Sequence, residues 1–156
     1  MDPHTSNSQP SLSFSRTLPA SRERAYRAWT NPSELRKWFG PDGYKAVSVH
    51  MDVRHGGMYW FHFKTDSLDE EAYHEACLQG EFREVRPPSK LVYTWRWHDL
   101  DRLPETAASE VTVELTDLGG STEAKISHDR ISEPEGRKRC ERIWRKSLDK
   151  LGQFFG

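Results

Sequence analysis

Alternating apolar and polar residues predict seven β-strands in this chain. The first covers residues 12–18 and ends at Pro19. Two helical segments follow, and then six further strands are separated by short turns such as Gly56-Gly57 and Gly119-Gly120. These six strands are expected at residues 45–53, 58–65, 73–85, 90–97, 111–115 and 122–128. A run of strands without intervening helices predicts one antiparallel sheet.

For two of these strands, the sequence also bears on which side chains share a face of the sheet. In the strand at 45–53, alternation places four apolar residues on one face: Val47, Val49, Met51 and Val53. In the strand at 73–85 the alternation is imperfect, and Gly80 predicts a bulge or bend there. The register of this strand therefore stays open, and with it the question whether Glu75, Glu81 and Arg83 point inward.

Three segments have the period of a helix. The first covers residues 21–29, and the second is capped by Asn31, with Pro32 in its first position. A capping box of Ser132 and Glu135 predicts the start of a helix of about 20 residues at the C-terminus. Its apolar face is Cys140, Trp144, Leu148, Leu151 and Phe155. Its opposite face is basic, which is typical of a solvated surface and is also suited to an acidic partner.

Composition narrows the class of protein. The 156 residues include 23 Lys and Arg against 24 Asp and Glu, a net charge of −1. This balance argues against a protein that coats nucleic acid or binds membranes through a polybasic patch. No apolar stretch approaches the ~20 residues of a membrane span, and the polar residues 1–10 are expected to form a disordered tail before a domain at 11–156. Cytoplasmic localisation is expected, with Cys77 and Cys140 as thiols, although a disulfide stays open.

Large rings must supply much of the core. The chain has 6 Trp, 5 Tyr and 7 Phe, and each buried ring removes about 150–250 Å² from water. A core of a few large rings often leaves gaps or a cavity. Signatures of a phosphate-binding loop, a zinc protease or a serine hydrolase are missing, so the sequence predicts no catalytic residue, no metal ligand and no cofactor.

Several short motifs give the chain a family resemblance. They are RTLPA from Arg16, AWTNP from Ala28, WFGP from Trp38, Gly56-Gly57, GEFREV from Gly80, PSKLVYTW from Pro88 and WRKSL from Trp144. Together they resemble homologues of the C-terminal domain of the heat-shock protein 90 ATPase activator, in the START-like (SRPBCC, Bet v 1-like) superfamily.

The resemblance covers about residues 12–155 and implies an α+β helix-grip fold. In that fold a curved seven-stranded antiparallel sheet wraps a long C-terminal helix, two short helices follow strand 1, and an apolar cavity can lie between sheet and helix. Relatives often have glycine where this chain has Ile143, so Ile143 is expected to shift the helix or fill part of the cavity.

The inward faces of sheet and helix define the candidate ligand site. Its residues are Tyr59, Phe61, Phe63, Tyr93, Trp95, Trp97, His128, Trp144 and Leu148, with Trp38 and Phe39 as a gate at one end. Two interpretations are open: a filled core, or a pocket lined by aromatic side chains. His128 is either a satisfied core histidine or a group that orients a polar part of a ligand.

Three functions remain after these exclusions, because the fold alone does not choose among them. The preferred hypothesis is a binding protein for a small hydrophobic or aromatic molecule. An enzyme resembling polyketide cyclases or hydrolases would need paired titratable groups around His128. A chaperone-associated protein-binding module is the third, and Trp60 and His62 on the outer sheet face suggest a possible homodimer.

Overall fold

The computed structural model describes residues 11–65, 74–99, 108–132 and 134–155. The expected tail at residues 1–10 lies outside these ranges. The described segments form seven strands and three helices in chain order: β1 (Leu12–Leu18), α1 (Arg22–Thr30), α2 (Pro32–Trp38), β2 (Tyr44–Met51), β3 (Met58–Thr65), β4 (Glu75–Arg86), β5 (Lys90–Asp99), β6 (Ser109–Asp117), β7 (Thr122–Asp129) and α3 (Pro134–Phe155).

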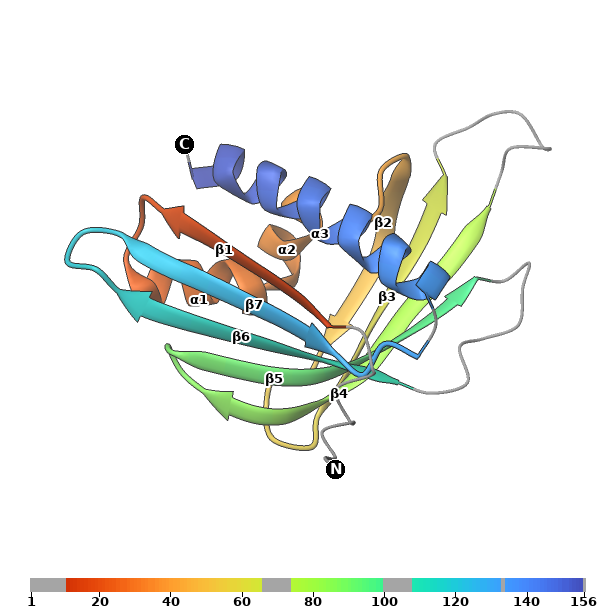
Figure 1. Cartoon of the computed structure of the whole chain (residues 1–156), viewed down its shortest axis with the longest axis horizontal. Coiled ribbons are helices and arrows are strands. Elements are labelled where there is room, and N and C mark those ends of the chain that lie inside the picture. The colour runs from red at the N-terminus through yellow and green to blue at the C-terminus, as the bar shows by residue number, and fades with distance from the viewer. Residues whose placement is uncertain (1–10, 66–73, 100–107, 133, 156) are drawn as a thin grey trace, which may run out of the picture.

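The sheet is antiparallel throughout and has the spatial order β1-β7-β6-β5-β4-β3-β2. It curves around α3, which crosses its concave side, while α1 and α2 pack against β6, β2 and α3 (Figure 1). This arrangement is the helix-grip fold, and it confirms the predicted α+β architecture. None of the described helices is long and apolar enough to cross a membrane.

The helix starts follow the capping chemistry of the sequence. The Oγ of Ser21 accepts a hydrogen bond from the backbone N–H of Arg24, and the Oδ1 of Asn31 accepts from the N–H groups of Ser33 and Glu34. Helix α3 begins at Pro134. The predicted capping box before it includes residue 133, outside the described ranges, and stays a prediction.

The prediction for the faces of β2 is wrong at Val47. The pairing of β2 with β3 shifts by one residue between Ala46 and Ser48, which is a β-bulge. Because side chains alternate along a strand, the extra residue turns Ala46 inward and leaves Val47 40% exposed. Val49 and Met51 lie opposite the buried Phe61 and Tyr59 of β3 and are half-buried, so they share one face as predicted.

Gly80 is required by a close approach between strands. The bulge in β4 lies between Phe82 and Glu84, not at Gly80. A Cβ atom added at Gly80 would lie 1.9 Å from the carbonyl oxygen of Thr94 and 2.6 Å from the ring of Tyr59. Glycine therefore lets β4 and β5 bend together beneath that ring.

We expect Gly80→Ala to lower the free energy of unfolding by at least about 2 kcal/mol, because the methyl group meets backbone that cannot move aside cheaply. Gly152→Ala is the matched control: it lies in α3 with open space around its Cβ position, so it should stabilise the protein by about 0.5–1 kcal/mol. Urea denaturation measures both. Equal stability of the Gly80→Ala variant and the parent would contradict the close approach.

Candidate ligand-binding site

The centre of the molecule is a cluster of aromatic rings around Phe39. Its ring centroid lies 5.2 Å from that of Phe61 in β3, 5.7 Å from Trp95 in β5 and 5.7 Å from Trp144 in α3. Phe39 is the C-cap residue that directly follows α2, and its ring lies between the sheet and α3. The sequence predicted Phe39 as part of a gate, whereas the structure places it at the middle of the core.

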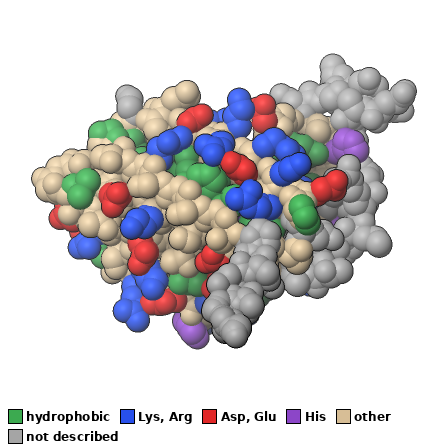
Figure 2. Space-filling model, in the orientation of Figure 1, with side chains coloured by type: hydrophobic (Ala, Val, Ile, Leu, Met, Phe, Trp, Pro, Cys, Tyr) green, Lys and Arg blue, Asp and Glu red, His purple; other side chains and the backbone are tan. Residues whose placement is uncertain are grey.

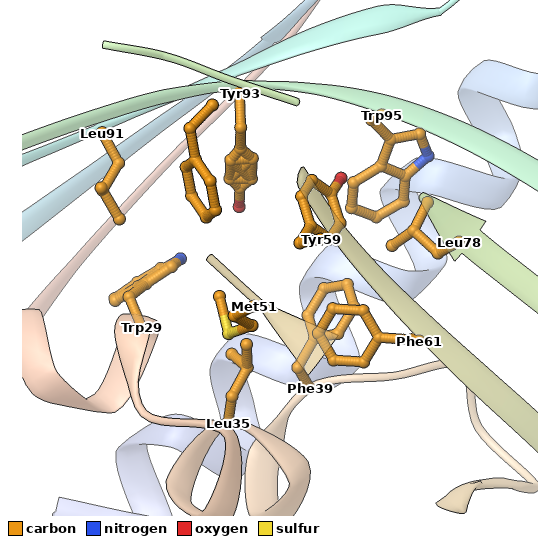
Figure 3. Close-up of a pocket in the computed structure, with 11 residues that line it drawn as sticks. Trp29, Leu35, Phe39, Met51, Tyr59, Phe61, Leu78, Leu91, Tyr93 and Trp95 are labelled. Atoms are coloured by element: carbon orange, nitrogen blue, oxygen red, sulfur yellow. The ribbon is translucent and has the colours of Figure 1, made fainter. Parts of the chain in front are cut away.

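All ten predicted site residues are buried, but they do not line one pocket. Four of them line a small cavity, here called the ring cavity: Tyr59, Phe61, Tyr93 and Trp95, together with Trp29, Leu35, Phe39, Met51, Leu78, Phe82 and Leu91 (Figure 3). Five others pack into the surrounding core: Trp38, Phe63, His128, Trp144 and Leu148. The tenth, Trp97, lines a separate groove.

The ring cavity is almost filled by its own side chains. Its volume is about 20 Å³, which is enough for about one water molecule and far below the roughly 300 Å³ of a typical small-molecule pocket. The aromatic core is therefore nearly filled, which favours the first of the two interpretations of these residues.

One polar pair interrupts the apolar wall of the ring cavity. The indole Nε1 of Trp29 is buried, and within the described residues it has no hydrogen-bond partner. It lies on the same side of the cavity as the Tyr93 hydroxyl (Figure 3). Burial raises the pKa of Tyr93, and the nearby indole N–H partly opposes that rise.

His128 is held by hydrogen bonds at both ring nitrogens. The Nε1–H of Trp144 donates to its Nδ1 at 3.0 Å, so the proton of the neutral imidazole is on Nε2. Nε2 then donates to the Oγ of Ser109 at 2.7 Å, and that hydroxyl donates to the carbonyl oxygen of Trp95 at 3.2 Å. Burial lowers the pKa of His128 to about 3. The chain of donors and acceptors is complete, which is the geometry of a satisfied core histidine.

An enzyme would need a second titratable side chain close to His128. None of the three candidates in β4 points toward it. The inward residues of β4 are Ala76, Leu78, Gly80 and Phe82, so Glu75, Glu81 and Arg83 lie on the other face. Glu75 there contacts Nε2 of His62 at 2.7 Å. The hydrogen-bond partners of His128 are a hydroxyl and an indole, and neither is a general acid or base at neutral pH. The described residues also contain no cluster of three metal-ligating side chains.

A larger hollow lies between α3 and two strands of the sheet, at the start of β2 and near the end of β5. Its volume is about 520 Å³. We call it the α3 groove and define it by its lining: Pro41, Asp42, Tyr44, Trp97, Arg139, Arg142, Ile143, Arg145, Lys146 and Asp149. The ring of Trp97 also contacts Phe63, with centroids 5.8 Å apart, so the groove is built directly onto the aromatic core.

Ile143 contributes to this groove as well as to the core. Its side chain is buried beside Trp144, and it lines the α3 groove opposite Trp97 and Tyr44. The sequence singled out Ile143 and Trp97, but it placed Trp97 in a common pocket with the other rings. Tyr44 was missed as a site residue, and the α3 cations were noted only as a basic helix face suited to an acidic partner, because the proximity of Tyr44 to these cations exists only in the folded chain.

The hydrogen-bond chain through His128 predicts a pH-dependent stability. Between pH 6.5 and about 3 the unfolded chain binds a proton at this residue that the folded protein does not. The free energy of unfolding should therefore fall with decreasing pH, by up to about 1.4 kcal/mol per unit from this group. His128→Gln, whose amide can replace both hydrogen bonds but cannot titrate, should show a shallower fall between pH 6 and 4 in urea denaturation. The same slope in both proteins would contradict the assignment.

Solved structures share this architecture. Protein CV1439 from Chromobacterium violaceum is 25% identical, with a TM-score of 0.78 over 93% of this chain and 96% of that one. The AHSA1 (SPO3351) protein from Silicibacter pomeroyi is 23% identical, with a TM-score of 0.77 over 92% and 96%. A protein from Arthrobacter aurescens is 20% identical, with a TM-score of 0.76 over 93% and 85%. The last two likenesses concern the fold alone.

Sequence comparison gives the family directly. No curated protein matches the chain. The family model described as activator of Hsp90 ATPase homolog 1-like protein matches residues 19–156, which include both short helices, six of the seven strands and α3. The chain therefore belongs to the AHSA1 family, the activator of Hsp90 ATPase homolog 1-like proteins.

Proposed function

We propose that this protein binds a small molecule with a hydrophobic or aromatic body, and that the α3 groove is where it binds. The observation that carries the proposal is the volume of the groove, about 520 Å³, next to an aromatic core whose own cavity has about 20 Å³. A molecule of ordinary ligand size fits the first space and not the second.

The chemistry of the groove supports the same conclusion. Trp97 and Ile143 form its nearly buried apolar floor, and the half-buried ring of Tyr44 adds the apolar surface that a ring or short alkyl chain would cover. Burying apolar surface there contributes about 25 cal/mol per Å². Trp97 is held in place by the ring of Phe63 behind it, so the surface is formed before the ligand arrives.

Of the alternative functions, the enzyme hypothesis loses its specific motivation because His128 is fully hydrogen-bonded. The chaperone-associated and homodimer hypotheses stay predictions. Trp60 is 42% exposed on the outer sheet face and stacks on His50, at a centroid distance of 5.9 Å. That face lies on the opposite side of the sheet from α3, so such an interface would leave the α3 groove accessible.

The neutral fluorescent probe N-phenyl-1-naphthylamine tests the proposal with the full chain. We expect saturable binding of one probe per protein. Tyr44→Ala should weaken it about tenfold, since losing about 50 Å² of apolar contact costs about 1.3 kcal/mol. Trp60→Ala is the matched control, because it removes an exposed ring from the other face, and it should leave the affinity unchanged.

The proposal is contradicted if the probe does not bind, or if Trp60→Ala weakens binding while Tyr44→Ala does not. Circular dichroism spectra and thermal melts of both variants separate a lost contact from a lost fold.

A further inference from the structure

The ionisable side chains of the α3 groove are not balanced. Four cations line it, against two carboxylates. One member of each sign is already paired with a residue outside the groove: Arg145 donates to Glu141 at 2.9 Å, and Asp149 accepts from Arg16 at 2.8 Å. The remaining groups are the cations Arg139, Arg142 and Lys146 and the carboxylate Asp42.

The three remaining cations form one stripe along α3. Arg139, Arg142 and Lys146 follow each other at spacings of three and four residues, which places them on the same helix face. The guanidinium of Arg139 lies 6.0 Å from the centroid of the Trp97 ring, a cation–π contact. Arg142 and Lys146 are exposed and, in the described part of the chain, have no ion-pair partner. Figure 2 shows Lys and Arg side chains gathered over α3.

The positive charge continues on the other side of Tyr44. A neighbouring hollow of about 330 Å³ shares Tyr44 with the groove and is lined by Arg36, Lys37, Lys45 and Lys150. Among the residues that the structure describes, no carboxylate lines this hollow. The net charge of the whole chain is −1, so this concentration of cations is a local feature and not a consequence of composition.

An apolar surface bordered by cations matches an amphipathic anion. The apolar body would lie against the half-buried ring of Tyr44, above the buried side chains of Trp97 and Ile143, while the charged group would lie against the cations on α3. Asp42 opposes an anion nearby, but it is one carboxylate against three cations. Arginine presents several N–H donors in a fixed plane, which suits carboxylate, sulfonate and phosphate oxygens.

We propose that the α3 groove selects ligands in which an apolar body carries one anionic group, and that Arg142 and Lys146 contact that group. This inference rests on the proposed function and specifies its ligand class. The anion can be a carboxylate, a sulfonate or a phosphate, since all three offer the same acceptor oxygens.

Two probes with the same ring system separate the two proposals. 8-Anilinonaphthalene-1-sulfonate carries a sulfonate that N-phenyl-1-naphthylamine lacks. At low salt we expect the parent protein to bind the sulfonate about tenfold more tightly. The double variant Arg142→Gln/Lys146→Gln should remove this advantage, so that it binds the two probes with equal affinity.

A double variant elsewhere controls for overall charge. Lys125→Gln/Lys138→Gln also removes two positive charges, but from exposed positions on β7 and α3 that do not line the groove. It should preserve the tenfold advantage. If it reduces the affinity for the sulfonate as much as the groove variant does, the selection comes from the whole molecule and the inference is overturned.

The remaining outcomes are also decisive. Equal affinity of the parent for both probes overturns the anionic selection and leaves the proposed function standing, whereas no binding of either probe overturns both. Competition with dodecanoate and 1-naphthoate identifies the body of the ligand as alkyl or aromatic. If neither displaces the bound sulfonate, the groove does not select carboxylates and the class is wrong.

Discussion

A buried hydrogen-bond chain sets the position of α3 against the sheet, and the apolar side chains that the helix buries hold it there. From Trp144 through His128 and Ser109 to the carbonyl oxygen of Trp95, it joins α3 to β7, β6 and β5. Each buried donor has an acceptor, and leaving one of them unpaired costs about 1–3 kcal/mol. A shift of α3 relative to the sheet would break the chain, so the helix has one favoured position. The α3 groove exists because the helix is held there.

The aromatic core follows from the same position. With α3 fixed, the rings of Phe39, Trp95 and Trp144 meet at centroid distances of 5.7 Å and fill the space that the helix-grip fold encloses. Aromatic rings at such separations gain more than their burial alone provides. Opening the interior to a ligand would give up these contacts. Space for a molecule is therefore found at the edge of the core, where Trp97 meets α3.

Much of the fold, and less of the site, was predictable from the sequence. Alternation identified the strands, although it was imperfect in β4, and the cap at Asn31 identified the start of α2, because both signals are local. The face of Val47 was mispredicted, since a bulge depends on the partner strand. His128 was correctly placed inward, but its hydrogen-bond partners come from β6 and α3. The α3 groove joins residues about one hundred positions apart, such as Tyr44 and Lys146, and no local pattern reports their proximity.

The central claim is that ligands occupy the α3 groove while the aromatic core stays closed. A crystal structure of the protein in complex with N-phenyl-1-naphthylamine tests it most directly. The account predicts density for the probe between Trp97 and α3, with the ring of Phe39 still packed against Trp144. Density between Trp29 and Tyr93, with the rings around them displaced, would contradict it.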